Sequence, residues 1–133
     1  MTASSETLPI RSENDIVSVR QAVRAQAVRL KYSLVDQTKI VTAASELARN
    51  TLIYGGGGEA RLELISEGMR HGLRISFIDC GPGIRDIDEA LRDGFTSGKG
   101  MGLGLGGARR LVNEFHIESK VGEGTCVVIT KWK

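Results

Sequence analysis

Hydrophobic residues recur at helical spacing in two stretches of the first half of the chain. The first stretch follows capping side chains at 12–15, and its predicted buried stripe consists of Ile16, Val19, Val23, Ala27 and Leu30. In the second, Asp36 is the predicted cap and the glycines at 55–58 end the helix, with a buried stripe of Ile40, Ala43, Ala44 and Leu47. Two amphipathic helices are therefore predicted, each with one face turned towards a common core.

Alternating apolar positions predict two β-hairpins. Their strands are predicted at 60–64 and 73–77, and again at 117–121 and 126–132. The first pair is separated by a turn at 67–72 and the second by Gly122-Glu123-Gly124. A strand that alternates in this way has one buried face, so both hairpins are expected to cover the helices.

The remaining segments complete the predicted fold. Residues 7–11 read as a short edge strand, because proline is tolerated there, and 1–6 as a loose tail. A short helical pattern at 84–94 and a polar, lid-like connection at 95–99 precede a third helix at 107–115, with Ala108, Leu111, Val112 and Phe115 inward. Helices on one face of a mainly antiparallel or mixed sheet make a two-layer α+β sandwich.

Composition narrows the class of protein. The length of 133 residues favours a single domain spanning 1–133, and 41% hydrophobic with 26% charged residues is typical of a soluble globular protein. A net charge of +2 without a basic run excludes a nucleic-acid surface, and the chain lacks a long apolar span for a membrane or a signal peptide. Two cysteines without metal or disulfide spacing fit a reducing cytoplasm.

The stretch from Asp79 to Gly107 carries the candidate chemistry. It opens with Gly81-Pro82-Gly83 directly after a strand, and it closes with a glycine-rich run at 100–107 before a helix. Glycine lets backbone amides approach an anion, so 100–107 is a candidate phosphate loop and Asp79 a candidate base-recognising carboxylate. The order of elements excludes a dinucleotide-binding βαβ unit, and the Gly-Lys-Ser/Thr ending of a Walker loop is missing.

Glu46 and Asn50 form a second candidate pair. Four residues apart on one predicted helix, their side chains lie one turn apart and can converge on one ligand or one hydrated metal ion. Taken alone, such a pair is more often surface hydrogen bonding than a site, and an Asp before Gly-Pro-Gly is more often a turn cap. The pair gains meaning from the glycine loops downstream.

Four ordered motifs together resemble a known family. They are Glu46-x-x-x-Asn50, Asp79-x-Gly81-x-Gly83, Gly100-x-Gly102-x-Gly104 and Gly122-x-Gly124-Thr125. In this order they resemble the Bergerat-fold (GHKL) ATPases, the family of gyrase B, Hsp90, sensor histidine kinases and MutL. The resemblance covers nearly the whole chain and implies ATP and Mg²⁺ as cofactors.

The resemblance also implies a role for each motif residue. Asn50 would coordinate Mg²⁺, Asp79 would accept from the exocyclic amine of adenine, and the hydroxyl of Thr125 would make a second adenine contact. Gly81 and Gly83 would shape the adenine pocket. The phosphate loop would be formed by Gly100, Gly102 and Gly104, beneath a lid at 84–99. Lys99 in this lid is a candidate for stabilising phosphate charge, although a lid lysine is more often exposed to solvent.

Within this family, the chain resembles the small bacterial serine/threonine kinases of partner-switching systems. It has no phosphoacceptor histidine on a dimerisation helix, since His71 and His116 fall in a predicted turn and at a strand start. The resemblance implies that Glu46 is the general base towards a Ser or Thr of a STAS-domain partner, with a phosphatase or sigma-pathway regulator as a further partner. Arg49 could hold that partner or the γ-phosphate, or be a surface arginine.

Two other functions stay open from the sequence. The anti-sigma-factor kinases share the nucleotide motifs, so the chain could sequester a sigma subunit. A nucleotide-gated interaction module without catalysis is the second alternative, and an intact Glu46 argues against it. The sequence leaves the oligomeric state open.

Overall fold

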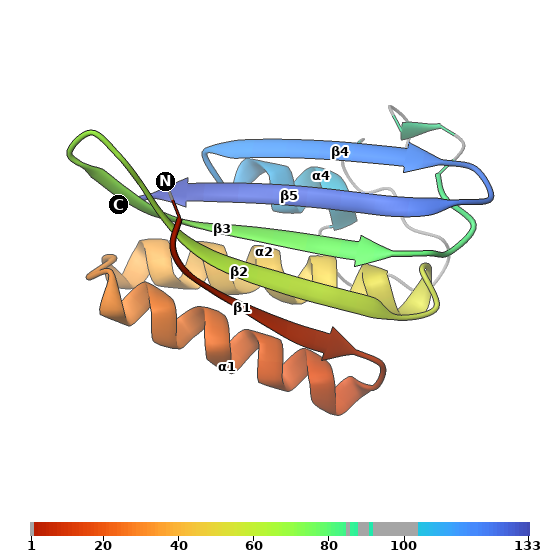
Figure 1. Ribbon diagram of the computed structural model, residues 1–133, viewed down its shortest axis with the longest axis horizontal. Helices are drawn as coiled ribbons and strands as arrows, with labels where there is room; N and C mark the ends of the chain where they lie inside the picture. The colour runs from red at the N-terminus through yellow and green to blue at the C-terminus, as the bar shows by residue number, and fades with distance from the viewer. Residues whose placement is uncertain (1, 85, 88–90, 92–103) are drawn as a thin grey trace.

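The computed structural model describes residues 2–84, 86–87, 91 and 104–133. Within these residues, two long helices and a short one accompany five strands (Figure 1). In chain order the elements are β1 (Thr2–Ile10), α1 (Glu13–Arg29), α2 (Leu34–Ile53), β2 (Gly58–Glu67), β3 (Arg70–Asp79), α4 (Gly104–Arg110), β4 (Glu114–Lys120) and β5 (Gly124–Trp132).

The strands form one antiparallel sheet in the order β1-β2-β3-β5-β4. Both predicted hairpins are present, and β2 and β3 pair from Gly58 opposite Asp79 to Glu67 opposite Arg70. The last strand, β5, lies between β3 and the edge strand β4. Asp79 therefore ends the central strand, directly opposite Thr125 of β5.

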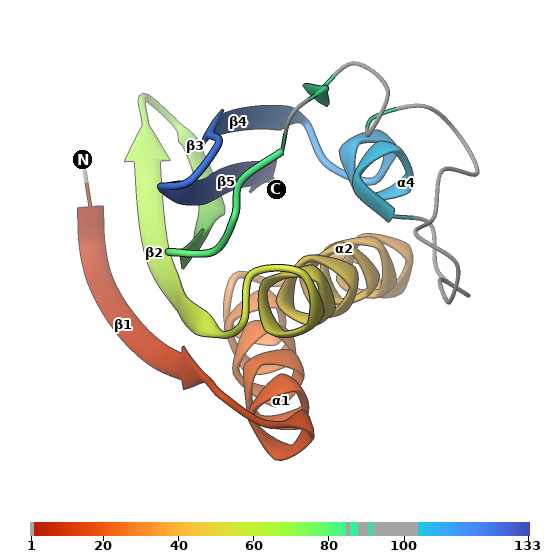
Figure 2. The ribbon, with the colours of Figure 1, turned by 90° about the vertical axis from the view of Figure 1, so that its right-hand side faces the viewer.

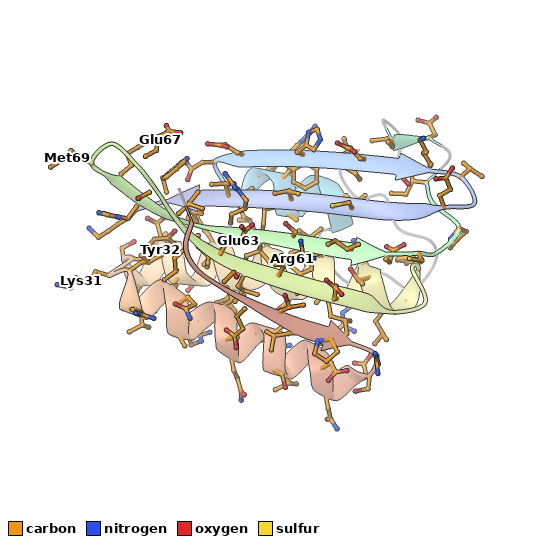
Figure 3. All side chains as sticks on the ribbon, viewed as in Figure 1. Lys31, Tyr32, Arg61, Glu63, Glu67 and Met69 are labelled. Carbon is orange, nitrogen blue, oxygen red and sulfur yellow. The ribbon has the colours of Figure 1, made fainter. Side chains whose placement is uncertain are left out.

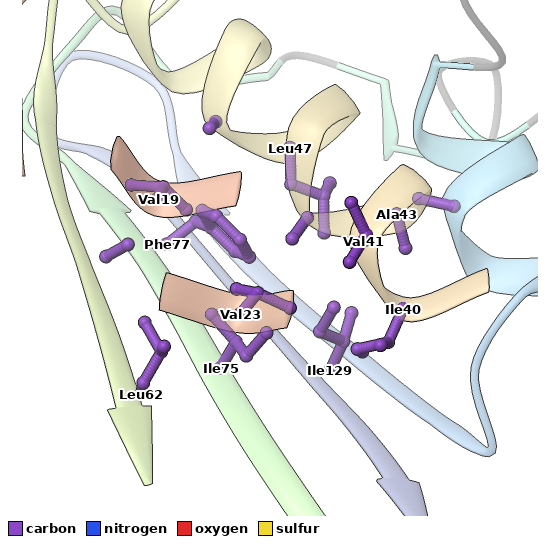
Figure 4. Packing of buried hydrophobic residues seen from close by; sticks show 14 of the residues in the cluster. Val19, Val23, Ile40, Val41, Ala43, Leu47, Leu62, Ile75, Phe77 and Ile129 are labelled. Carbon is purple, nitrogen blue, oxygen red and sulfur yellow. The ribbon is translucent and has the colours of Figure 1, made fainter. Parts of the chain in front are cut away.

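The helices lie on one face of the sheet, as predicted (Figure 2). Alternate strand residues point at them, while Arg61 and Glu63 of β2 alternate with the buried Ala60 and Leu62 (Figure 3). Figure 4 shows the core between the layers, where α1 and α2 contribute Val19, Val23, Ile40, Val41, Ala43 and Leu47 and the sheet contributes Leu62, Ile75, Phe77 and Ile129. The two-layer α+β sandwich is confirmed.

Two predictions about the N-terminal half were wrong. Strand β1 begins at Thr2, so residues 2–6 are not a loose tail; their backbone pairs with the long edge of β2, where Ser4 lies opposite Leu64. Ser33, rather than Asp36, caps α2, because its Oγ accepts from the Asp36 N–H at 3.1 Å. Asp36 instead occupies the first turn, where a carboxylate also favours the helix.

The third helix begins and ends earlier than the predicted range of 107–115. Helix α4 covers Gly104–Arg110, and Phe115 lies in β4 opposite Ile129. Phe115 lies in a strand rather than in the helix because β5 offers an edge with which β4 can pair. A local sequence pattern does not reveal that edge. Of the short helix predicted at 84–94, the Leu91 N–H donates to the Ile87 oxygen at 3.0 Å; most of that helix and the connection at 95–99 lie outside the described residues.

Candidate nucleotide site

The Asp79 carboxylate is half-buried at the end of β3 and is held through one oxygen. Its Oδ1 accepts from the Gly81 N–H at 2.9 Å and from the Thr125 N–H at 3.2 Å. Oδ2 accepts from no donor within the part of the chain that the structure describes. The carboxylate is thus oriented by the backbone of two segments, while its second oxygen keeps its accepting capacity for a ligand.

The end of α2 packs directly against this carboxylate. A methyl group on Gly55 would lie 2.4 Å from Asp79 Cγ and 2.5 Å from Oδ2, and one on Gly81 would lie 2.7 Å from the Gly55 Cα. The Gly55 N–H in turn donates to the main-chain oxygen of Asn50 at 3.2 Å. Gly55 therefore brings the helix that carries Asn50 into contact with the strand end that carries Asp79.

Sequence reasoning missed this role for Gly55, which it interpreted only as a helix end. The signal was present in the run of four glycines at 55–58, which is longer than a helix stop requires. A further glycine for close approach follows at Gly58, where a methyl group would lie 2.0 Å from the Ile78 oxygen.

Ser119 is a second residue that the sequence did not reveal. Its Oγ lies 2.8 Å from Thr125 Oγ1, accepts from the Ile84 N–H at 2.7 Å and lies 3.2 Å from the Gly124 oxygen. Ser119 has one hydroxyl hydrogen; when it donates to Gly124, Thr125 must donate to Ser119. The Thr125 oxygen then keeps both of its lone pairs as acceptors.

The Gly81–Gly83 turn is fastened to the β4–β5 hairpin. The Gly122 N–H donates to the Pro82 oxygen at 2.8 Å. Gly83 has a φ of +79°, and a methyl group there would lie 2.3 Å from the Lys120 oxygen, so both conformation and space require glycine. The turn after Asp79 is consequently held in place by its contacts with Gly122 and Lys120 of the β4–β5 hairpin.

Glu46 and Asn50 lie on α2 at the border of its buried face. Both are half-buried, between the buried Leu47 and Ala48 and the exposed Arg49. The Arg49 guanidinium pairs with Glu13 of α1 at 3.9 Å, and both side chains are exposed. Glu46 and Asn50 are therefore one turn apart at a partly dehydrated rim, and Arg49 takes part in a surface ion pair.

Gly104 begins α4, which packs beside α2 (Figure 2). Lys99, Gly100 and Gly102 lie outside the described residues. Among the residues that are described, no group of three or more His, Cys, Asp or Glu side chains could hold a metal ion. None of the described helices is long and apolar enough to span a membrane.

Comparison with known proteins decides the family. Residues 35–133 match the family described as histidine kinase-, DNA gyrase B- and HSP90-like ATPases. The chain belongs to this ATPase family. The match includes the helix with Glu46 and Asn50, the Asp79 turn and the final hairpin. Membership of this family implies ATP as the nucleotide.

Two relatives place this ATPase domain among small kinases and anti-sigma factors. It is 45% identical over 123 residues to the serine/threonine-protein kinase RsbT of Bacillus subtilis, covering 92% of each chain. It is 32% identical over 119 residues to the anti-sigma F factor of Anoxybacillus flavithermus, covering 84% of this chain and 80% of the relative.

Solved structures share the fold. The structure of the RsbU and RsbW domains of Rv1364c from Mycobacterium tuberculosis matches with a TM-score of 0.66 and 21% identity, over 98% of this chain and 33% of that one. The SiaB-SiaC complex of Pseudomonas aeruginosa matches with a TM-score of 0.56 and 13% identity, over 99% of this chain and 91% of that one. At these identities the likeness confirms the architecture.

Proposed function

We propose that this chain is an ATP-dependent serine/threonine protein kinase that acts by partner switching, with residues 1–133 as one cytoplasmic kinase domain. The similarity to RsbT supports the activity. The observation that carries the proposal is the contact between Gly55 and the Asp79 carboxylate, because it joins a base-recognising group to the helix that bears Glu46 and Asn50.

The adenine end of the site is built around Asp79. Its free Oδ2 accepts a hydrogen bond from the exocyclic amine of adenine, while Oδ1 stays bonded to the Gly81 and Thr125 amides. The Thr125 hydroxyl, oriented by Ser119, makes the second contact to the base. Gly81 and Gly83 shape the adenine pocket by letting the turn pack closely against Gly55 and against the Lys120 main chain.

The phosphate end lies towards α2 and α4. The Asn50 side-chain oxygen is a hard ligand of the kind that Mg²⁺ takes in small number, with water and phosphate oxygens completing the shell. Backbone amides of Gly100, Gly102 and Gly104 bind the phosphate oxygens, and Lys99 adds positive charge where negative charge develops in phosphoryl transfer.

Glu46 is the general base of the proposed reaction. It takes the proton from the hydroxyl of an incoming Ser or Thr, whose oxygen attacks the γ-phosphorus as the bond to the β-phosphate oxygen breaks. The partner proteins are STAS domains of the anti-sigma-antagonist or stressosome type. Phosphorylation releases one partner and frees the kinase for another, a phosphatase or sigma-pathway regulator.

The second candidate function is sequestration of a sigma subunit. The identity of 32% to an anti-sigma F factor favours it, and such a protein would use the same nucleotide site. The two functions differ in the main partner, because the kinase requires a hydroxyl acceptor and the anti-sigma factor requires a sigma subunit.

The decisive experiment follows labelled γ-phosphate from Mg²⁺-ATP to a panel of purified STAS-domain proteins. Wild type should label a Ser or Thr of one of them. Glu46→Gln should bind ATP as wild type does and transfer phosphate about 100-fold or more slowly, because it lacks the base. Glu13→Gln is the matched control, since it removes an exposed carboxylate from the neighbouring helix.

The results test the role of Glu46 and the function of the chain separately. Equal rates for Glu46→Gln and wild type would remove Glu46 from the role of base. ATP binding without transfer to any acceptor, together with capture of a purified sigma subunit, would replace the kinase with the anti-sigma factor.

A further inference from the structure

A lysine occupies a core-facing position of the final strand. Val127 and Ile129 of β5 are buried against the helices, and the alternation of the strand puts Lys131 next in that row. Its side chain is only 8% exposed. A charged group at such a position is retained only with partners, so its contacts identify its role.

The Lys131 ammonium joins the ends of two helices. Nζ donates to the Leu111 oxygen, just past the end of α4, at 3.3 Å and lies 3.5 Å from Asp36 Oδ1 in the first turn of α2. A cation is favoured at a helix C-terminus and a carboxylate at a helix N-terminus. Positive and negative charges therefore alternate: the partly positive α2 N-terminus, the Asp36 carboxylate, the Lys131 ammonium and the partly negative α4 C-terminus.

Further bonds fix the same end of α4 to β5. The Asn113 N–H donates to the Thr130 oxygen at 3.0 Å, and the Asn113 side-chain oxygen accepts from the Trp132 N–H at 2.7 Å. The Tyr32 hydroxyl donates to the Lys131 main-chain oxygen from the α1–α2 connection. The segment after α4 is thereby tied to β5, and β5 in turn is tied to the connection between α1 and α2.

The interface between α4 and α2 gives these bonds their importance. The buried residues of α4 include Gly106, Gly107 and Ala108, and α2 presents buried alanines such as Ala43, which lies beside α4 in Figure 4. Small residues allow the helices to approach but offer few interlocking side chains to fix one helix along the other. The contacts of Lys131 with Leu111 and Asp36 fix the position of α4 along α2 at one end.

We propose that Lys131 is a positioning residue for the nucleotide phosphates. It fixes α4, whose first residue is Gly104, relative to α2, which carries Glu46 and Asn50. The inference rests on the proposed function, because it takes the assignment of Gly104 to the phosphate loop from there. An apolar side chain in place of a buried ion pair is often no less stable, so stability alone does not account for the lysine.

The test separates the two ends of the nucleotide. Lys131→Met should weaken Mg²⁺-ATP binding about tenfold, the range in which residues outside a site modulate affinity, and should leave adenosine binding at the wild-type value. Lys131→Arg, which keeps the charge, should restore most of the affinity for ATP. Asp36→Asn, which keeps the Ser33 cap, should weaken ATP binding in the same direction by less. Titration calorimetry gives both affinities at a temperature where all variants are folded.

Two control variants separate the loss of the Lys131 contacts from a general loss of positive charge and from a general loss of stability. Lys39→Met removes an exposed lysine from α2, the helix that carries Asp36. Val19→Ala destabilises the core in α1, away from α4. Both should bind ATP as wild type does. Unchanged ATP affinity in Lys131→Met, or an equal loss for ATP and adenosine, would overturn the positioning role. If Lys131→Met does not fold, Asp36→Asn decides by the same criterion. A wild type that binds neither ligand would overturn the proposed function itself.

Discussion

Replacing Gly55 with alanine tests whether the contact between α2 and Asp79 creates the adenine site. The new methyl carbon would lie 2.4 Å from Asp79 Cγ, whereas carbon atoms in contact are about 3.5–4.0 Å apart, so the carboxylate must move by about 1 Å or more. The movement breaks its alignment with the Gly81 and Thr125 amides. Overpacking of this kind costs about 1–3 kcal/mol of folding free energy.

The loss in ATP binding follows from the hydrogen bond that the carboxylate can no longer make. A bond to a charged group contributes about 1.5–3 kcal/mol, so the dissociation constant for ATP should rise roughly 10- to 100-fold. Titration calorimetry measures the affinity, and urea unfolding measures the stability of the same sample.

Gly68→Ala is the matched control for Gly55→Ala. Gly68 has a φ of +62° with open space around it, in the β2–β3 turn beside Met69 (Figure 3). Alanine there costs about 1–2 kcal/mol through backbone strain and touches no nucleotide group. The reasoning fails if Gly55→Ala binds ATP with the affinity of wild type, or if Gly68→Ala loses as much affinity as Gly55→Ala.

Two further predictions concern Ser119 and Tyr32. Ser119→Ala leaves the Ile84 amide and the Thr125 hydroxyl without their partner. The free energy of unfolding should therefore fall by about 1–2 kcal/mol, and ATP should bind more weakly. Unchanged ATP affinity in calorimetry would show that Thr125 does not need the hydrogen bond to Ser119. Burial, with Asp36 nearby, raises the pKa of Tyr32 from 10.0 to about 12. The folded state then retains a proton that the unfolded state loses, so about 1–2 kcal/mol of stability should disappear between pH 10 and 12. Urea unfolding across this range should show a flatter pH profile for Tyr32→Phe than for wild type. A Tyr32→Phe profile as steep as that of wild type would contradict the assignment.

The sequence predicted the elements better than their neighbours in space. Periodicity located α1, α2 and both hairpins because burial of one face imposes a repeat that the residues display. The place of β5 between β3 and β4 could not be predicted, since strand pairing depends on long-range backbone hydrogen bonds that leave no local pattern.

The candidate site shows the same division. Asp79 and its glycine turn were recognisable from local chemistry, and the structure puts Thr125 opposite Asp79. The supporting residues Gly55 and Ser119 were not recognisable, because each acts on a segment distant in the chain. The proposed roles of Glu46 and Asn50 stay predictions that the kinase experiment addresses.

The central place of the last strand constrains how the protein can be made. While the chain is being synthesised, β3 is complete well before β5, and until Gly124 and its successors emerge β3 presents an unpaired edge. Such an edge is a template for pairing with other chains, so nascent or prematurely terminated molecules are exposed to aggregation. They also lack the Thr125 amide that orients Asp79. A truncated product should therefore aggregate more readily than the full chain and bind ATP more weakly.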